Sequence, residues 1–215
     1  MVKDYTAKLT KKEWKSDYTL IMNFESDVDV EFQGGQFINV ILPSKVARAY
    51  SISSSENKKR SFEILFGYYP GGKASEYFKA LNIGEEIKFK APFGRFFMHP
   101  DNVANTIFVG TGTGIAPIKS MIDTLFENNQ RNSNIYVFEG IRQYVDAGYE
   151  KEFLKYQEMG FMFIILSSLP NSCLKGFVLI TEDDIEEITT KNLLSSTSLF
   201  TVKFLMNSIY ISICL

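Results

Sequence analysis

Glycines cluster in the stretch GTGTGIAP (residues 110–117), which follows an apolar run and precedes a helical pattern. Gly110, Gly112 and Gly114 would let the backbone approach an anion closely, and the first turn of a helix offers unpaired N–H groups. A turn from strand to helix lies at the carboxyl end of a parallel strand, where open α/β sheets bind ligands. The sequence therefore favours a phosphate site here. The alternative is a glycine-rich turn that binds nothing.

Two common nucleotide motifs do not fit this turn. Ile115 stands where GxGxxG, counted from Gly110, requires its last glycine. The Gly-Lys-Ser/Thr that would complete a P-loop is also missing. The predicted phosphate turn is therefore of another kind.

A second candidate is RAYS (residues 48–51), followed by further hydroxyl side chains. In a strand, Arg48 and Tyr50 would project from one face, and Ala49 and Ser51 from the other. An arginine can hold a phosphate while a neighbouring aromatic ring stacks on a planar group. In the alternative, Arg48 pairs with a surface carboxylate and Tyr50 is half-buried packing. Taken alone, these four residues favour that alternative.

The third candidate is YPGGKASEYF (residues 69–78). Two glycines precede a helix whose first residues include Ser75. Backbone amides and a hydroxyl could converge there on phosphate oxygens. The alternative is a helix start at which the serine serves as a cap.

Composition argues against several other chemistries. Cys173 and Cys214 cannot supply four thiolates for a zinc site or an iron–sulfur cluster, so no metal site is expected. His99 is the only imidazole, and no nucleophile-elbow motif accompanies it. A formal net charge of -2 gives no basic field that would attract nucleic acid or an anionic membrane.

The rhythm of the chain predicts two domains, residues 1–99 and 104–215. In the first, aromatic and β-branched runs at 17–25, 35–42, 48–53, 61–67 and 85–92, with one helix at 74–81, indicate an antiparallel β-barrel. In the second, strands at 105–110, 133–140 and 161–168 alternate with helices at 114–129 and 146–160. That alternation predicts a parallel α/β sheet.

The order of the three motifs resembles the ferredoxin–NADP reductase superfamily, and within it the FAD- and NAD(P)H-binding reductase modules that supply electrons to oxygenases. The resemblance covers about residues 1–178. It implies that Arg48 holds the flavin phosphates, that Tyr50 stacks on the isoalloxazine, and that Ser51 hydrogen-bonds near its N5. Ala49, between Arg48 and Tyr50, is implied to belong to the same cofactor site. It also implies that the segment Gly72, Lys73, Ala74 and Ser75 cradles the flavin pyrophosphate.

The same resemblance assigns the nicotinamide cofactor to Gly112, Thr113 and Gly114, with Thr113 close to where nicotinamide meets flavin. Arg142, in a Gly-x-Arg segment, would face the adenosine end of that cofactor. Tyr50, Ser51 and Thr113 are thus the residues implied to lie at the reacting atoms.

The function implied by the resemblance is hydride transfer from NADH or NADPH to bound FAD, and then electron transfer to an external acceptor. That acceptor would be an iron–sulfur protein, an oxygenase or a small molecule. Two alternatives stay open. One is a flavin reductase that uses free flavin as its substrate, and the other is a non-catalytic, redox-sensing module that binds flavin or nucleotide.

The family pattern ends near residue 178. The family's Cys-Gly-x-Pro element is not found, and Gly176 is the final glycine, so the parallel sheet is expected to be incomplete at its C-terminal end. A divergent ending and a shifted reading frame both explain this, and the lack of a clean period in 199–215 favours the second. Lys203 and Asn207 interrupt the apolar tail, and the start has no apolar leader, so a cytoplasmic protein is expected.

Overall fold

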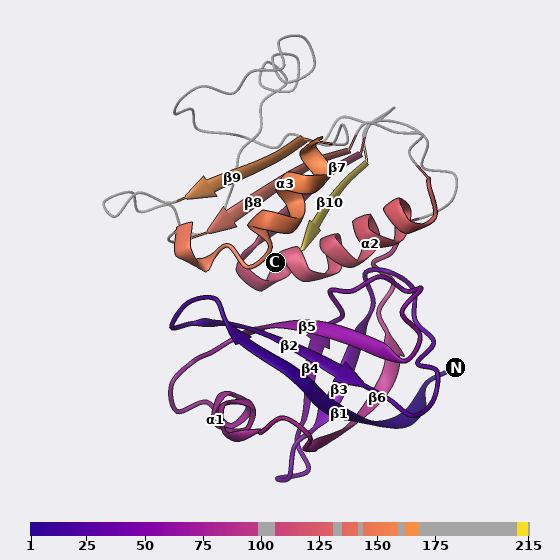
Figure 1. Ribbon diagram of the computed structural model, residues 1–215, viewed down its shortest axis with the longest axis vertical. Helices are drawn as coiled ribbons and strands as arrows, with labels where there is room; N and C mark the ends of the chain where they lie inside the picture. The colour runs from indigo at the N-terminus through magenta and orange to yellow at the C-terminus, as the bar shows by residue number, and fades with distance from the viewer. Residues whose placement is uncertain (99–105, 131–134, 142–143, 159–161, 168–209, 215) are drawn as a thin grey trace.

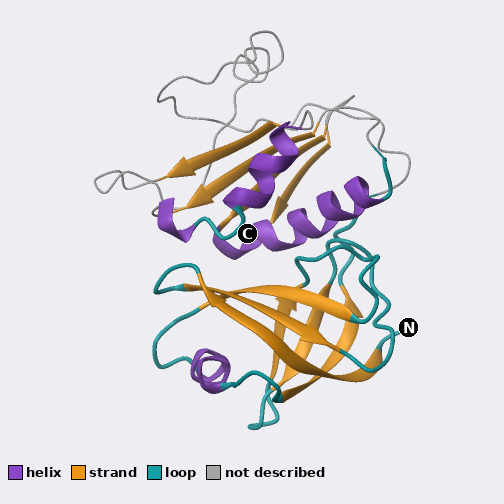
Figure 2. Ribbon diagram, viewed as in Figure 1, coloured by secondary structure: helices purple, strands orange, loops and turns teal. Residues whose placement is uncertain are grey.

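The computed structural model describes residues 1–98, 106–130, 135–141, 144–158, 162–167 and 210–214. These residues form two β-sheets of different kinds, which lie one above the other in Figure 1. Figure 2 shows that the lower half is almost entirely strands and loops, whereas helices accompany the upper sheet. The two-part architecture predicted from the sequence, β-rich and then α/β, is confirmed.

The first sheet has six antiparallel strands in the order β4-β3-β6-β1-β2-β5. The strands are β1 (Lys3–Trp14), β2 (Thr19–Glu25), β3 (Phe37–Ile41), β4 (Ala47–Ser51), β5 (Ser61–Gly67) and β6 (Glu86–Phe93). The edge strands β4 and β5 approach each other, because Ile52 bridges to Ile64. The sheet thus curls into a barrel, which removes most of its exposed edge.

Strand β1 is an addition to the strands expected from the sequence. Tyr5, Ala7 and Leu9 are buried, while the residues between them are exposed. Alternation of this kind marks a strand with one face on a core. Because β1 lies between β6 and β2, the N-terminal residues form a central strand of the barrel sheet.

Helix α1 (Lys73–Ala80) follows β5 and lies one residue earlier than the predicted range 74–81. Its Phe78 is fully buried in the barrel core. The Lys12 ammonium donates to the carbonyl oxygens of Lys79 at 2.7 Å and Leu81 at 2.9 Å. These bonds satisfy carbonyl groups that the end of a helix leaves without partners.

The second sheet is parallel, with the order β10-β7-β8-β9. Its strands are β7 (Thr106–Thr111), β8 (Ile135–Ile141), β9 (Met162–Ser167) and β10 (Tyr210–Cys214). After β7 come the 3₁₀ turn η1 (Gly112–Gly114) and helix α2 (Ile115–Glu127), and after β8 come η2 (Tyr144–Asp146) and α3 (Glu150–Glu158). The predicted strand–helix alternation is confirmed.

Strand β10 contributes to the parallel sheet from the part of the chain where the family pattern was not found. It pairs with β7, and Cys214 stands opposite Gly110. The tail therefore adds a strand beside the one that leads into the glycine-rich turn. Cys173 and His99 lie outside the described residues.

Two hydrophobic cores hold the molecule together. One fills the barrel, and the other joins α2, α3 and the parallel sheet to Ile21 and Leu65 on the outside of the barrel. Figure 1 accordingly shows α2 between the parallel sheet and the barrel. Within the described ranges, no helix is long and apolar enough to cross a membrane. In the same ranges, no three or more His, Cys, Asp or Glu side chains are grouped to hold a metal ion.

Candidate functional site

Arg48 lies on β4, an edge strand of the barrel sheet. Val40 of β3 stands opposite Arg48, and Ile38 opposite Tyr50, so Arg48 and Tyr50 share one face as predicted. Arg48 is exposed, and its Nη1 donates to the carbonyl oxygen of Ala47 at 3.0 Å. Among the described residues no carboxylate pairs with Arg48, contrary to the surface ion-pair alternative. Its guanidinium therefore has donors available for an anion.

The ring of Tyr50 is half-buried between β5 and α1. It packs against Phe66 with ring centroids 5.5 Å apart, and edge-on against Phe78 at 5.2 Å. Burial raises the pKa of Tyr50 to about 12, although the nearby Arg48 lowers it, so the phenol is neutral at physiological pH. The packing alternative thus holds for the ring, and the same packing ties β4 to the second half of α1. Of the other two RAYS residues, Ala49 is exposed and Ser51 is half-buried.

The N-terminus of α1 presents three backbone amides. In the described part of the chain, the N–H groups of Lys73, Ala74 and Ser75 make no hydrogen bond. Gly72 precedes them without a capping side chain, and a Cβ there would lie only 3.1 Å from the carbonyl oxygen of Tyr69. Three open amides at a helix start suit a phosphate oxygen, so this segment fits the predicted pyrophosphate cradle.

The hydroxyl of Ser75 is engaged within the chain. Its Oγ accepts a 2.9 Å hydrogen bond from the backbone amide of Tyr69, and the side chain is buried. The hydroxyl therefore holds the 69–72 loop in place and makes no cap bond. Glu76 supports the same loop, because its Oε1 accepts from the amide of Gly71 at 3.0 Å and from the Tyr68 hydroxyl at 3.0 Å. These bonds, that from Gly71 first, lower the pKa of Glu76.

The glycine-rich turn links β7 to α2. A Cβ at Gly110 would lie 3.0 Å from Ile118 Cδ1 and 3.2 Å from the carbonyl group of Gly114. The strand can therefore meet the helix closely only without a side chain at this position. Gly112 has φ +52°, a left-handed conformation that glycine adopts without strain. Gly114 is the N-cap of α2, and no side chain caps that end of the helix.

Thr113 connects this turn to the barrel half of the site. It is exposed, and its Cγ2 would lie 3.4 Å from a Cβ placed on Gly67, the last residue of β5. Gly67 follows Phe66, on which Tyr50 packs. The contacts Tyr50–Phe66, Tyr50–Phe78 and Gly67–Thr113 thus link residues of all three motifs near the end of β5. Arg142, the predicted adenosine contact, lies outside the described residues.

Two charged residues that the sequence did not single out are buried in the parallel-sheet half. Lys119 of α2 is 6% exposed and contacts the barrel. Glu139 of β8 is 0% exposed, and within the described residues neither carboxylate oxygen has a hydrogen-bond partner. Burial, and then the charge of Glu150, raise the pKa of Glu139 to about 8. Each is a single charged residue within an apolar run of the sequence, and this pattern could have predicted a buried charge.

Comparison with known proteins finds a family match for each half of the chain. Residues 6–98 match the family described as "Oxidoreductase FAD-binding domain", and residues 108–169 match "Oxidoreductase NAD-binding domain". The chain is similar to the phenol hydroxylase P5 protein of Acinetobacter pittii, with 31% identity over 71% of this chain and 43% of that protein. It is also similar to ferredoxin–NADP reductase B of Sorangium cellulosum, with 37% identity over 42% of this chain and 38% of that protein. It therefore spans less than half the length of either relative.

A solved structure extends the comparison to the fold. The ferredoxin NADP⁺ reductase of Neisseria gonorrhoeae, solved with bound FAD and NADP, superimposes with a TM-score of 0.73. The match covers 98% of this chain and 85% of that one. At 18% sequence identity, this likeness concerns the fold alone.

Proposed function

Because the chain belongs to the ferredoxin–NADP reductase superfamily, we propose that it is a flavin-dependent oxidoreductase that takes a hydride from NADH or NADPH. Residues 1–99 would form its FAD-binding domain and residues 104–215 its NAD(P)-binding domain. The observation that carries the proposal is that the three motifs meet near one end of β5. Tyr50 of RAYS packs on Phe66 of β5 and on Phe78 of α1. The side chain of Thr113 lies against Gly67, the last residue of β5.

Each group has a separate task in this proposal. The amides of Lys73, Ala74 and Ser75 and the Arg48 guanidinium bind the flavin pyrophosphate. The half-buried ring of Tyr50 packs on the buried rings of Phe66 and Phe78, and it offers an apolar face on which a planar ring can rest and which excludes water. FAD, when bound, supplies the chemistry by accepting a hydride and releasing electrons.

The nicotinamide cofactor is assigned to Gly112, Thr113 and Gly114. The positive end of the α2 dipole favours its phosphates there, and the close packing at Gly110 brings the turn against the helix. Thr113 and Ser51 are the hydroxyl groups proposed to meet the reacting rings, and Arg142 is proposed to contact the adenosine end. The side chains have no acid–base step to perform, since their work is alignment.

The electron acceptor is proposed to be a separate protein or molecule. The names of similar proteins include a phenol hydroxylase component and a ferredoxin–NADP reductase. By analogy with these proteins, we propose that the acceptor is an oxygenase, an iron–sulfur protein or a small molecule.

Absorbance spectroscopy tests the proposal. The purified protein should be yellow, release FAD on denaturation, and bleach under anaerobic conditions on mixing with NADH or NADPH. Comparing the two nucleotides would establish which is preferred. A colourless protein that reduces added riboflavin as readily as FAD would support the free-flavin reductase instead. Bound flavin that neither nucleotide bleaches would support a redox-sensing module.

A further inference from the structure

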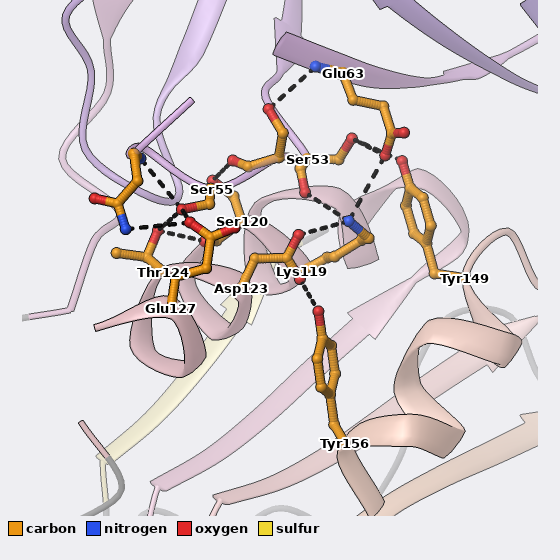
Figure 3. A network of polar contacts seen from close by, with 12 residues as sticks. Ser53, Ser55, Glu63, Lys119, Ser120, Asp123, Thr124, Glu127, Tyr149 and Tyr156 are labelled. Carbon is orange, nitrogen blue, oxygen red and sulfur yellow. Dashed lines mark hydrogen bonds and ion pairs between the residues drawn. The ribbon is translucent and has the colours of Figure 1, made fainter. Parts of the chain in front are cut away.

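Lys119 joins the two halves of the chain from inside their interface. It lies on α2, six residues after Thr113, and its ammonium is buried. Its Nζ lies 2.7 Å from Asp123 Oδ2 on the same helix. It also donates to the carbonyl oxygen of Ser53 at 3.3 Å and forms an ion pair with Glu63 of β5 at 3.7 Å. Figure 3 shows these contacts converging on the lysine.

The charge of Lys119 is well compensated. Burial alone lowers the pKa of Lys119, but the carboxylates of Asp123 and Glu63 outweigh burial and raise it. The Tyr149 ring adds a cation–π contact, with the ammonium 4.8 Å from its centroid. The lysine is therefore charged, and its position is determined from several directions at once.

The partners of Lys119 are themselves held in place. Glu63 accepts from Ser53 Oγ at 3.1 Å and from Asn23 Nδ2 at 2.9 Å. Asp123 accepts a hydrogen bond from the Tyr156 hydroxyl of α3. The network thus includes groups from β2, β5, α2 and α3.

The network connects the two segments that carry the candidate site. Ser53 lies two residues after Ser51, the end of β4, and α2 begins directly after the turn that contains Thr113. One residue along each segment, Ser120 Oγ donates to the carbonyl oxygen of Ser54 at 2.6 Å. The strand proposed to bind flavin (β4, called the flavin strand) and the turn proposed to bind nicotinamide (Gly112–Gly114, called the nicotinamide turn) are thereby fixed relative to each other.

A role in positioning explains this network better than stability alone. Buried ion pairs contribute little net stability compared with apolar side chains of the same size, because desolvation offsets the attraction. They do impose direction, since each charge must meet its partner at a defined distance. A small displacement of reacting groups can lower a rate by about 100-fold. We propose that Lys119 is a positioning residue, which sets the alignment of the nicotinamide turn with the flavin strand for hydride transfer; this rests on the proposed function.

The test compares Lys119→Met, Lys119→Arg and the wild type in the full chain. The control is Lys155→Met, which removes an exposed lysine of α3. In stopped-flow measurements, the rate at which NADH or NADPH reduces the bound FAD should be at least about tenfold lower in Lys119→Met than in the wild type. The affinity for the nicotinamide cofactor should change less than about threefold. Lys119→Arg should recover part of the rate, and Lys155→Met should match the wild type.

A second readout requires no cofactor. Hydrogen exchange of the apoprotein should become faster in residues 53–56 and 112–120 of Lys119→Met and remain unchanged in β6, which contributes no group to the network. Because Lys119→Met leaves buried carboxylates without a cation, Ser120→Ala serves as a milder variant that removes only the bond to Ser54. It should slow flavin reduction in the same direction, by about two- to fivefold.

The outcomes separate the two proposals. If NADH or NADPH bleaches the wild type, and Lys119→Met bleaches equally fast with unchanged exchange, Lys119 has no positioning role. If Lys119→Met does not fold, an unchanged rate in Ser120→Ala leads to the same conclusion. If neither nucleotide bleaches wild-type flavin, the proposed function is wrong, and the role of Lys119 in hydride transfer is rejected with it.

Discussion

The hydroxyl of Tyr149 donates a 2.7 Å hydrogen bond to Ser53 Oγ, joining the start of α3 to the segment that follows β4 (Figure 3). Tyr149 is fully buried, and burial raises its pKa well above the usual value, so the hydroxyl keeps its proton. Ser53 in turn donates to Glu63 at 3.1 Å. The serine run after RAYS therefore serves the interface between the two halves of the chain.

Removing the Tyr149 hydroxyl should lower the stability of the folded protein. Tyr149→Phe keeps the ring and its contact with Lys119 but deletes one buried hydrogen bond. We expect its free energy of unfolding in urea to fall by about 1 kcal/mol. Tyr69→Phe is the matched control, because Tyr69 is 67% exposed and the change should cost almost nothing. Equal effects in the two variants would show that the Tyr149–Ser53 bond contributes no stability.

Glu139 should make stability depend on pH. Burial raises its pKa from 4.5 to about 8, so the folded state binds this proton more tightly than the unfolded chain does. Stability should therefore fall as pH rises from about 4.5 to about 8, with no further loss from this group above that range. Glu139→Gln has a similar shape and no titration. It should resemble the wild type near pH 4.5 and exceed it near pH 8.5 by about 2–4 kcal/mol.

The measurement is urea unfolding of Glu139→Gln and the wild type across this pH range. Glu25→Gln is the control, because Glu25 is an exposed carboxylate at the end of β2. It measures how much of any pH effect comes from the loss of one exposed carboxylate. A difference for Glu139→Gln that also stays constant from pH 5 to pH 8.5 would mean that Glu139 ionises normally.

Local patterns predicted much of the fold. Apolar periodicity predicted α2 and α3, and the alternation of strands with helices predicted the parallel sheet. Both patterns can be read from the sequence because they arise from residues that are close together along the chain. The alternation that defines β1, with Tyr5, Ala7 and Leu9 inward, was also present in the sequence.

The site was predicted less completely, because side-chain partners depend on packing between distant segments. Ser75 fits either a cap or a phosphate ligand from its position alone, and only the folded 69–72 loop shows its bond to Tyr69. Lys119 and Glu63 are far apart in sequence and meet where the two halves pack together. A contact between residues so far apart leaves no periodic pattern in the sequence that could predict it.

The glycine-rich turn offers a paired test of sterics and backbone conformation. Gly110→Ala would place a Cβ 3.0 Å from Ile118 Cδ1 and 3.2 Å from backbone atoms of Gly114, which cannot easily move. We expect it to lower the free energy of unfolding by about 1–3 kcal/mol. We also expect it to weaken nicotinamide binding, because the turn must shift.

Gly112 should respond differently, because nothing lies within 4 Å of its added Cβ and only φ +52° resists substitution. Gly112→Ala should cost about 1 kcal/mol, whereas Gly112→Asn should cost less, since asparagine adopts left-handed conformations more readily. Urea unfolding measures both. The interpretation fails if Gly110→Ala is as stable as the wild type, or if asparagine and alanine at 112 are equally costly.

Arg48 allows flavin binding to be separated from stability. Its hydrogen bond goes to the neighbouring Ala47 carbonyl, and the side chain is exposed, so Arg48→Gln should leave the free energy of unfolding of the apoprotein almost unchanged. A charged hydrogen bond to phosphate contributes about 1.5–3 kcal/mol, so the dissociation constant for FAD should rise about 10- to 100-fold. The loss should shrink as salt screens the attraction in the wild type.

Arg60→Gln is the matched control for this loss of charge. Arg60 is also exposed, and it pairs with Asp29 at 2.9 Å in the region between β2 and β5, away from the predicted cradle. Fluorescence titration of the apoprotein with FAD should show wild-type affinity for Arg60→Gln. If both arginine variants bind FAD as the wild type does, Arg48 does not hold the flavin phosphates. If both weaken binding equally, the effect belongs to net charge, because a specific contact requires Arg48 alone to matter.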